Sequence, residues 1–405
     1  MKPISTIVDF LGLRRSMVGL LGMVILIGMG ERMAERFLPI YLLALGGGDL
    51  AIGLLNGTAN LLGALYSFPG GYLSDRIGAK RALLVFNLLT IAGFLIVILI
   101  PSWPAVIGGS FLFLSWTAIS LPATMGLVAR VLPKNQRTMG VSMHSLVRRL
   151  PMALGPLAGG LFIARWGERD GVRMAFAAAL VMAIFAIVMQ QRLIAEDAPT
   201  PDKKVAPRKN PLAVLRRMGP SLWSLLASDI LIRFCEQIPY AFVVVWCMKT
   251  IAHPTTAFQF GILTSVEMTT AVLCYIPVAY FADRGGKKPF ILMTFVFFTL
   301  FPLTLLFCHS FVWLAAAFVL RGLKEFGEPT RKALIMDLAP DDAKAATFGA
   351  YYLARDVIVS IAAFGGFFLW EIAPAANLLA AFAFGVLGTV WFAWRGQDVD
   401  YERAQ

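Results

Sequence analysis

The chain has 405 residues, of which 58% are hydrophobic and only 15% are charged, with a mean hydropathy of +0.74 and a formal net charge of +12. A soluble chain of this length would carry far more charge, so the composition excludes an ordinary soluble protein. The positions of the cations, described below, argue against nucleic-acid binding.

Apolar stretches of about 20 residues, long enough to cross the hydrocarbon core of a bilayer, recur along the whole chain. We expect membrane helices at residues 16–41, 50–73, 81–100, 103–130, 139–164 and 172–189. Further helices are expected at residues 220–247, 258–282, 289–308, 310–338, 347–370 and 377–394. The sequence therefore predicts an all-α integral membrane protein with twelve spanning helices.

A polar segment rich in proline and charge, residues 190–219, separates the two sets of helices. It predicts an N-terminal bundle at 1–189, a cytoplasmic linker at 190–219 and a C-terminal bundle at 220–405, with a short interfacial helix possible at the end of the linker. Residues 1–15 are too short for a signal peptide, and Glu31 and Arg32 interrupt the apolar stretch that follows.

Lysine and arginine gather on one side of the predicted helices, which sets the orientation of the chain. These cations are Lys2, Arg14, Arg15, Arg76, Lys80, Arg81, Lys134, Arg137, Lys203, Lys204, Arg208, Lys209, Arg216, Arg217, Arg284, Lys287, Lys288 and Arg395. The opposite side has mainly Arg165, Arg169, Arg173 and Lys249. Both termini are therefore expected in the cytoplasm, in a bacterial inner membrane or a plasma membrane, with the cations facing anionic lipid headgroups.

The two halves of the chain are related in sequence. A shift of 208 residues (283 minus 75) aligns the segment from Gly53 with the segment from Gly261 without a gap. Under this shift Gly53, Pro69, Tyr72, Asp75 and Gly78 meet Gly261, Pro277, Tyr280, Asp283 and Gly286. An internal repeat of this kind is a recurrent plan of transporters, with the substrate site at the interface of the repeats.

The repeat contains a polar loop, GGYLSDRIGAKR at 70–81, and a related one, AYFADRGGKK, at 279–288. Asp75 is expected at the C-terminus of its helix, where a carboxylate opposes the helix dipole and needs a partner elsewhere. A nearby arginine or a helix N-terminus in the other half would make this contact a latch for the inner gate. The gating candidates are Gly71, Asp75, Arg76, Gly78, Lys80, Arg81, Asp283, Arg284, Gly286 and Lys288, with Arg148 and Arg355 at matched places in the fifth and eleventh helices.

The pattern G-x-L-x-D-R-x-G-x-[KR]-[KR] at Gly71 to Arg81 resembles the signature loop of the major facilitator superfamily. The second copy keeps Asp283, Arg284, Gly286 and Lys288, while Ala279 replaces the first glycine. The resemblance covers essentially the whole chain. It implies two pseudo-symmetric six-helix bundles that transport a solute by alternating access, with helices one, four, seven and ten lining a central cavity.

A second stretch, ALGPLAGG at 153–160, resembles the core of a motif of drug:proton antiporters in this superfamily. Pro151 and Ser142 stand where that motif has further glycines. Small residues allow close helix packing and proline bends a helix, so we expect tight packing across the interface of the halves. Generic packing of small residues is the alternative interpretation. The packing candidates are Gly155, Pro156, Gly159 and Gly160.

Charged residues inside membrane helices are costly and normally face partners or a watery cavity. Three predicted helices carry them in stripes, and Glu267 stands alone in the eighth helix. The stripes are Glu31, Arg32, Glu35 and Arg36 in the first helix, Asp229, Arg233 and Glu236 at i, i+4 and i+7 in the seventh, and Arg321, Lys324, Glu325, Glu328, Arg331 and Lys332 in the tenth. Buried carboxylates can exchange protons near neutral pH, which proton coupling requires. The stripes could instead be structural ion pairs, and Glu267 could bond to a hydroxyl. The candidates for substrate binding and proton coupling are Glu31, Glu35, Arg233, Glu236, Glu267, Arg321, Glu325 and Glu328.

No catalytic or metal-binding pattern is present in the sequence. The four cysteines, Cys235, Cys247, Cys274 and Cys308, lie in apolar runs without metal-like spacing. There is no P-loop, HExxH or G-x-S-x-G motif, which argues against an ATP-driven pump and against a membrane-embedded enzyme. We expect no cofactor and no metal.

Together these features predict a secondary active transporter whose partners are a small-molecule substrate, protons or another coupling ion, and lipid. The first hypothesis is proton-coupled export of an organic amphipathic solute by a monomer. The second is import of an organic anion or metabolite by symport. A non-transporting receptor would need a sizeable soluble domain, and the longest polar segment is the linker.

Overall fold

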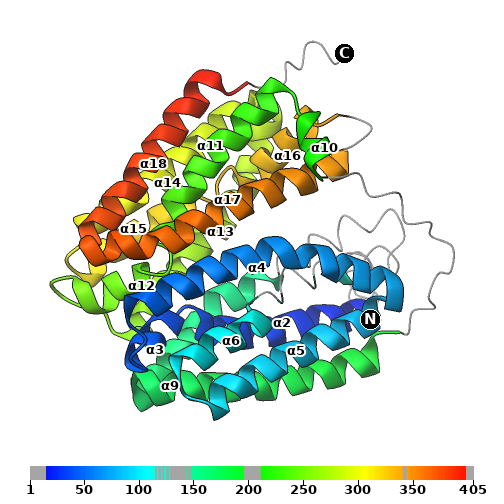
Figure 1. The fold of residues 1–405 in the computed structure, drawn as a ribbon, viewed down its shortest axis with the longest axis vertical. Coiled ribbons are helices and arrows are strands. Elements are labelled where there is room, and N and C mark those ends of the chain that lie inside the picture. The colour runs from blue at the N-terminus through cyan, green and yellow to red at the C-terminus, as the bar shows by residue number, and fades with distance from the viewer. Residues whose placement is uncertain are drawn as a thin grey trace, which may run out of the picture. The chain divides into compact units, whose positions relative to one another are not determined.

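The computed structural model describes residues 15–114, 116, 120, 123–124, 127, 144, 147–195, 211–340 and 344–397. Within these ranges the side chains of 67–72, 75, 211–213, 275–285 and 344–346 lie outside the description. Every regular element among the described residues is a helix (Figure 1).

The helices of the first half follow the predicted apolar stretches. They are α2 (Arg15–Glu35), α3 (Leu38–Ala44), α4 (Gly48–Ile77), α5 (Ala79–Leu99), α6 (Trp103–Phe113) and α9 (Arg149–Leu193). The 45 residues of α9 cover two predicted helices, because the backbone turns at Gly167 with a φ of 78° and then continues. Only glycine adopts such a φ without strain.

The second half begins with α10 (Pro211–Arg216), a short helix at the end of the predicted linker. The helices that follow are α11 (Pro220–Gln237), α12 (Val243–Val245), a π-helical turn at Trp246–Thr250, α13 (Ala257–Gly285), α14 (Lys288–Leu306), α15 (Phe311–Leu323), α16 (Glu328–Leu338), α17 (Lys344–Ile372) and α18 (Pro374–Arg395).

Seven of the described helices are long and apolar enough to cross a membrane: α2, α5, α9, α13, α14, α17 and α18. The first predicted helix ends as α2 and resumes as α3, and the seventh and tenth are broken as well. A proline lies at or beside each break: Pro39, Pro239 and Pro329. Proline cannot donate a helical hydrogen bond, so it fits the start of a new helix. The count of twelve and the cytoplasmic termini therefore stay predictions.

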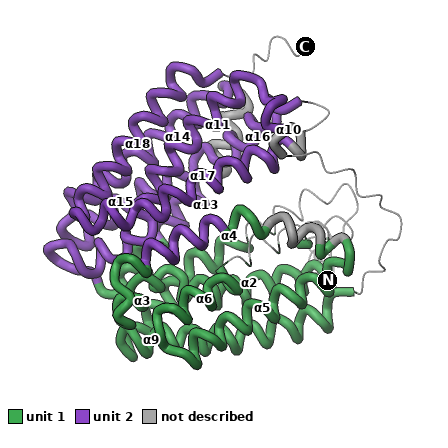
Figure 2. Tube along the Cα trace, viewed as in Figure 1, with its two compact units in different colours: residues 1–51, 62–203, 256–265 green, residues 52–61, 204–255, 266–405 purple. Residues whose placement is uncertain are grey.

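The chain forms two compact units (Figure 2). Unit 1 contains Met1–Ala51, Leu62–Lys203 and Thr256–Ser265, and unit 2 contains Ile52–Leu61, Lys204–Thr255 and Val266–Gln405. Each unit thus includes a short helical segment from the other half of the sequence, from α4 in unit 2 and from α13 in unit 1. The predicted bundle boundaries at 189 and 220 stay a prediction.

The α4 segment is held in unit 2 by small residues and amides. A side chain at Gly57 would overlap Phe364 of α17, so glycine is needed for this close approach. Asn56 Nδ2 donates to the carbonyl oxygen of Gln237 at 3.0 Å, and Asn60 Nδ2 donates to Gln237 Oε1 at 3.1 Å. These bonds attach α4 to the C-terminal end of α11.

The α13 segment is held in unit 1 by residues that the repeat aligns with those of the α4 segment. A Cβ added at Gly261 would lie 2.6 Å from the carbonyl oxygen of Pro156 in α9, and one added at Gly160 would lie 2.6 Å from that of Ala257. Ser265, aligned with Gly57 by the shift of 208, donates its hydroxyl to the carbonyl oxygen of Ala153 at 2.6 Å.

The other predicted packing glycines, Gly155 and Gly159, lie against α2 within unit 1. Their closest neighbours there are Arg32 and Met33. The stretch 153–160 therefore packs on two helices, α2 through Gly155 and Gly159 and α13 through Pro156 and Gly160.

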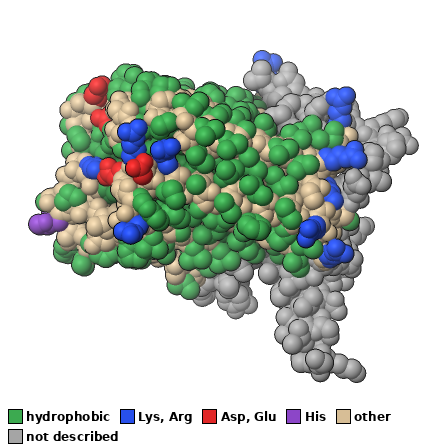
Figure 3. Space-filling view, turned by 90° about the horizontal axis from the view of Figure 1, so that it is seen from below, with side chains coloured by type: hydrophobic (Ala, Val, Ile, Leu, Met, Phe, Trp, Pro, Cys, Tyr) green, Lys and Arg blue, Asp and Glu red, His purple; other side chains and the backbone are tan. Residues whose placement is uncertain are grey.

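The surface suits a lipid environment. Figure 3 shows a face that is mostly hydrophobic, with lysine and arginine gathered toward its two ends. Large apolar side chains are well exposed on the long helix α9, including Leu161 at 55% and Phe185 at 62%. Helices satisfy their own backbone hydrogen bonds, so such a surface is stable in hydrocarbon.

Replacing Gly159 with alanine is expected to destabilise unit 1 by about 1–3 kcal/mol, because the new methyl group would overlap the Met33 carbonyl group of α2. Thermal unfolding of the purified protein in detergent measures the effect. The control is Gly108→Ala in α6, where nothing lies within 4 Å of an added Cβ. That variant should be unchanged or more stable by up to about 1 kcal/mol, and equal melting temperatures for both variants would contradict the packing assigned to Gly159.

Candidate functional site: a buried charge network in unit 2

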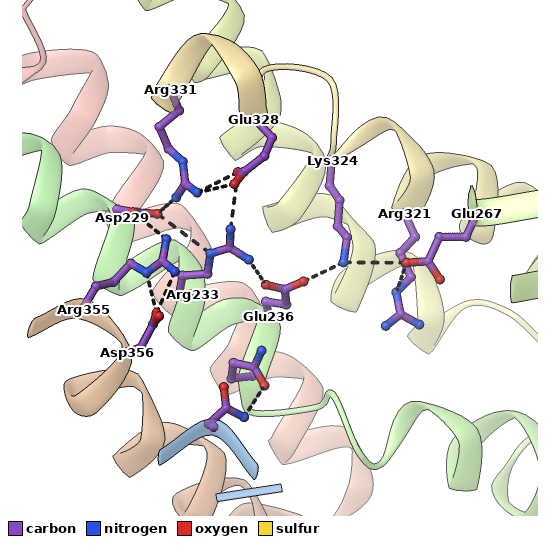
Figure 4. A network of polar contacts seen from close by, with 12 residues as sticks. Asp229, Arg233, Glu236, Glu267, Arg321, Lys324, Glu328, Arg331, Arg355 and Asp356 are labelled. Atoms are coloured by element: carbon purple, nitrogen blue, oxygen red, sulfur yellow. Dashed lines mark hydrogen bonds and ion pairs between the residues drawn. The ribbon is translucent and has the colours of Figure 1, made fainter. Parts of the chain in front are cut away.

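A network of charged side chains fills the interior of unit 2 (Figure 4). It begins on α11, where Asp229, Arg233 and Glu236 lie on one face at i, i+4 and i+7. Arg233 reaches both neighbours, with Nη1 at 2.5 Å from Glu236 Oε2 and Nε at 4.0 Å from Asp229 Oδ1. Its Nη2 lies 3.4 Å from Glu328 Oε2, which links α11 to α16.

Asp229 is fully buried and is the most heavily shared acid of the network. Its Oδ1 pairs with Arg331 of α16, and its Oδ2 accepts from Arg355 Nη1 at 3.3 Å and from the Tyr351 hydroxyl at 3.1 Å. Three helices therefore meet at one carboxylate. Removing water from a charge is costly unless partners replace it, so this site fixes α16 and α17 against α11.

Glu328 stands at the first position of α16, where the helix dipole favours an acid. Arg331, one turn later, donates to both of its oxygens at 2.8 and 2.7 Å, and Lys332 lies 3.4 Å from Oε1. Since Arg331 also pairs with Asp229, it bridges two carboxylates.

The network continues toward α13 and α15. Lys324 Nζ donates to Glu236 Oε1 at 2.6 Å and lies 3.7 Å from Glu267 Oε1. Arg321 Nε lies 3.2 Å from the same Glu267 oxygen. Glu267, which stands alone among the charged residues of its predicted helix, is thus a buried partner of two cations. The sequence does not predict these pairs, because Arg321 and Lys324 come from a different part of the chain than Glu267.

A glycine permits the Glu267–Arg321 contact. Gly322 follows Arg321 in α15, and a Cβ added there would lie 2.5 Å from the carbonyl oxygen of Glu267 and 2.6 Å from Thr270 Cβ. Only a residue without a side chain lets α15 approach α13 so closely.

A small pocket lies beside Arg321 and Lys324, with free space for about one water molecule. It is lined by Cys235, Glu236, Val243, Phe298, Phe301, Arg321 and Lys324. Two cations, one acid and two aromatic rings therefore meet around it.

Acids and cations balance among the described members of the network, if the half-exposed Lys332 at its edge is set aside. The acids are Asp229, Glu236, Glu267, Glu328 and Asp356, and the cations are Arg233, Arg321, Lys324, Arg331 and Arg355. A neutral set of buried charges changes its pairing whenever a proton or a charged ligand is added, because the added charge is left without compensation.

The remaining coupling candidates are Glu31, Glu35 and Glu325. Glu31 is buried in α2, and Glu35 pairs with Arg32 at 2.5 Å, all within unit 1. Glu325 lies in the turn between α15 and α16 and is partly exposed.

The gating candidates are described in part. The side chains of Asp75, Asp283 and Arg284 and the environment of Gly71 lie outside the described residues. Gly78 and Gly286 occupy matching turns, with φ values of 87° and 84° that favour glycine. Lys80 Nζ donates to the carbonyl oxygen of Gln191 at 3.1 Å in unit 1.

The five other gating candidates have different surroundings. Arg76 lies exposed in the last turn of α4 and Arg81 exposed in the first turn of α5, while Lys288 opens α14. Arg148 precedes α9. Arg355, predicted at the inner gate, belongs to the charge network through Asp229.

Sequence reasoning did not select Asp229, Lys324 and Arg331 as site residues, although all three belong to the charged stripes that it identified. It also missed the amides of Asn56, Asn60 and Gln237, because neutral amides give no recognisable spacing. The stripe at i, i+4 and i+7 was the signal that could have found Asp229.

The chain matches the model of the family described as Major Facilitator Superfamily, over residues 20–254 and 231–404. It is 21% identical over 374 residues to the uncharacterized MFS-type transporter MJ1317 of Methanocaldococcus jannaschii, covering 87% of each chain. It is also 32% identical over 138 residues to the uncharacterized MFS-type transporter YfkF of Bacillus subtilis, a match that spans 34% of this chain and 35% of YfkF.

Solved transporters share the fold. A crystal structure of the peptide transporter POT in complex with sulfate gives a TM-score of 0.77 at 13% identity, covering 94% of each chain. A mutant of the nucleoside transporter NupG gives 0.77 at 12% identity, covering 94% of this chain and all of the other. The human organic anion transporter MFSD10 gives 0.64 at 15% identity, covering 93% and 98%.

Replacing Asp229 with asparagine is expected to cost about 3–5 kcal/mol of stability, because Arg331 and Arg355 lose a buried countercharge. Thermal unfolding in detergent measures the loss. Asp356→Asn is the matched control, since it also removes a partner of Arg355 but at a side chain that is 31% exposed. Equal losses for the two variants would show that Asp229 does not organise the network.

Proposed function

The chain belongs to the major facilitator superfamily, and we propose that it is a multi-pass secondary transporter that couples the movement of an organic amphipathic solute to protons. It would work by alternating access of two bundles, with the loop residues Asp75 and Asp283 as latches of the inner gate. We propose a monomer in a bacterial cytoplasmic membrane. Relatives in a bacterium and an archaeon support this location.

The observation that carries the proposal is the balanced charge network of unit 2. Apart from the partly exposed Asp356, the side chains of its acids are at most 13% exposed, and each acid is paired with at least one arginine or lysine. A proton that neutralised Glu236 would leave Arg233 and Lys324 without their shared partner. Protonation and rearrangement of the site are therefore linked, which is what a coupling mechanism requires.

A transporter explains this network better than an enzyme does. Charges in a membrane bundle are retained at substrate and ion pathways despite their cost.

Export and import are each favoured by a different feature of the chain. Export is favoured by the resemblance of Ala153–Gly160 to the antiporter motif, and we retain it as the first candidate. Import of an organic anion together with a proton is the second candidate. The arginines and lysine of the network favour it, since they can bind a negatively charged group.

The direct test is a screen of organic solutes in proteoliposomes with imposed proton and sodium gradients. We expect at least one amphipathic solute to accumulate only when a proton gradient is present. Accumulation that followed the sodium gradient alone would contradict proton coupling.

Glu236→Gln and Glu328→Gln are each expected to abolish accumulation driven by a pH gradient, because glutamine keeps the shape of the side chain but cannot take up a proton. Exchange of solute across the membrane without a gradient should persist. The control is Asp170→Asn in unit 1, which removes an exposed ion pair with Arg173 and should leave both activities unchanged. Gradient-driven transport at the unmodified rate in both glutamine variants would remove these acids from the mechanism.

The direction of coupling is read from which side of the vesicle is acidic. An antiporter exchanges solute for protons, so an acidic lumen should drive accumulation. A symporter moves both together, so an acidic exterior should drive it. We expect the acidic lumen to be effective if export is the function, and accumulation with an acidic exterior would establish the second candidate in its place.

A further inference from the structure

Arg321 is a buried cation with unused hydrogen-bond donors. Its side chain is only 3% exposed, and its one ion pair runs from Nε to Glu267. Within the part of the chain that the structure describes, neither Nη1 nor Nη2 makes a hydrogen bond, and Figure 4 shows them pointing away from Glu267. A guanidinium has five N–H donors, so most of its capacity is free for a ligand.

Aromatic rings hold this guanidinium in place. Its Cζ lies 5.0 Å from the ring centre of Phe301, 5.4 Å from that of Phe318 and 5.9 Å from that of Tyr240. Cation–π contacts of this kind stabilise the charge without using its N–H donors. The rings also offer an apolar wall to the body of an amphipathic solute.

The pocket beside Arg321 contains a second cation. Lys324 lines it together with Glu236, and Lys324 Nζ lies 5.4 Å from the ring centre of Phe298. The pocket has free space for about one water molecule, so a larger head group enters only when the lining side chains move.

The charges that line the pocket belong to a network whose acids and cations already balance, because Glu236 is shared by Lys324 and Arg233, and Glu267 pairs with Arg321. An anion that entered would add an uncompensated negative charge in a buried site. By drawing Arg321 away from Glu267, the anion would also weaken the ion pair that stabilises the ionised form of Glu267. Uptake of one proton from solution by Glu267 restores neutrality, and no other bond is made or broken.

We propose that Arg321 binds the carboxylate of an amphipathic organic anion and that Glu267 takes up one proton in the same step. This rests on the proposed function and names the substrate class of its second candidate. A planar carboxylate matches the two Nη donors of arginine, whereas a spherical halide does not. A cationic solute would have to displace Arg321 or Lys324 from their acids.

The test is calorimetric titration of the purified full-length protein in detergent, with no gradient present. The probes are 4-phenylbutyrate, its amide and 4-phenylbutylamine, which share one apolar body, together with chloride. We expect the carboxylate to bind at least about tenfold more tightly than the amide or the amine. Titrations in buffers of different ionisation heat should show uptake of about one proton, and affinity should rise by up to about tenfold per unit fall in pH.

Variants assign the binding to the two residues. Arg321→Lys keeps the charge but loses the two parallel N–H donors of the guanidinium, and it should weaken carboxylate binding by about tenfold or more. The double variant Glu267→Gln/Arg321→Gln leaves no unbalanced charge, so it should fold and lose binding. Glu267→Gln alone should bind the carboxylate without taking up a proton. The control, Arg395→Gln, removes an exposed arginine stacked on Trp394 and should bind as the unmodified protein does.

Three results would overturn the proposal: equal affinity for the carboxylate and its amide, unchanged binding by the double variant, or binding of chloride without the carboxylate. Since binding is measured without a gradient, the test is independent of transport. Carboxylate binding at Arg321 in a protein that shows no gradient-driven transport would support this inference and refute the proposed function.

Discussion

Buried charge in an apolar bundle is the constraint on which unit 2 depends. Asp229 has no contact with solvent, and it is matched by Arg331 and Arg355 from two other helices. Because an unpaired charge there would cost several kcal/mol, these helices cannot slide past one another without breaking favourable pairs. The same constraint makes the site responsive, since a single proton changes which pairs can form.

Helix breaks and one glycine bring the charges together. The tenth predicted helix ends as α15 at Leu323 and resumes as α16 at Glu328, so its charged residues reach both Glu267 on one side and Asp229 on the other. Gly322 brings α15 against the backbone of α13 at Glu267. In a continuous helix the side chains would follow one fixed helical pitch, which fits the contacts with Glu267 and Asp229 less well.

The internal repeat explains features of both units. Gly78 and Gly286 have nearly the same left-handed φ, and the segments of α4 and α13 that join the other unit include the aligned pair Gly57 and Ser265. The halves differ in their polar content, however. Unit 2 holds the charge network. The described interior of unit 1 has the buried Glu31 and a neutral chain of Trp116, Asn87 and Gln190, linked by hydrogen bonds of 2.8 and 2.7 Å.

The sequence alone determined the all-helical membrane class, the repeat, the positions of most helices and the family, because these depend on local hydropathy and on short motifs. It also placed Arg233, Glu236 and Glu328 on charged stripes, since helical periodicity is local. Only the tertiary structure decided which charges meet. The pairing of Glu267 with Arg321, and the position of Asp229 among three helices, depend on contacts between residues far apart in the chain, which no local pattern encodes.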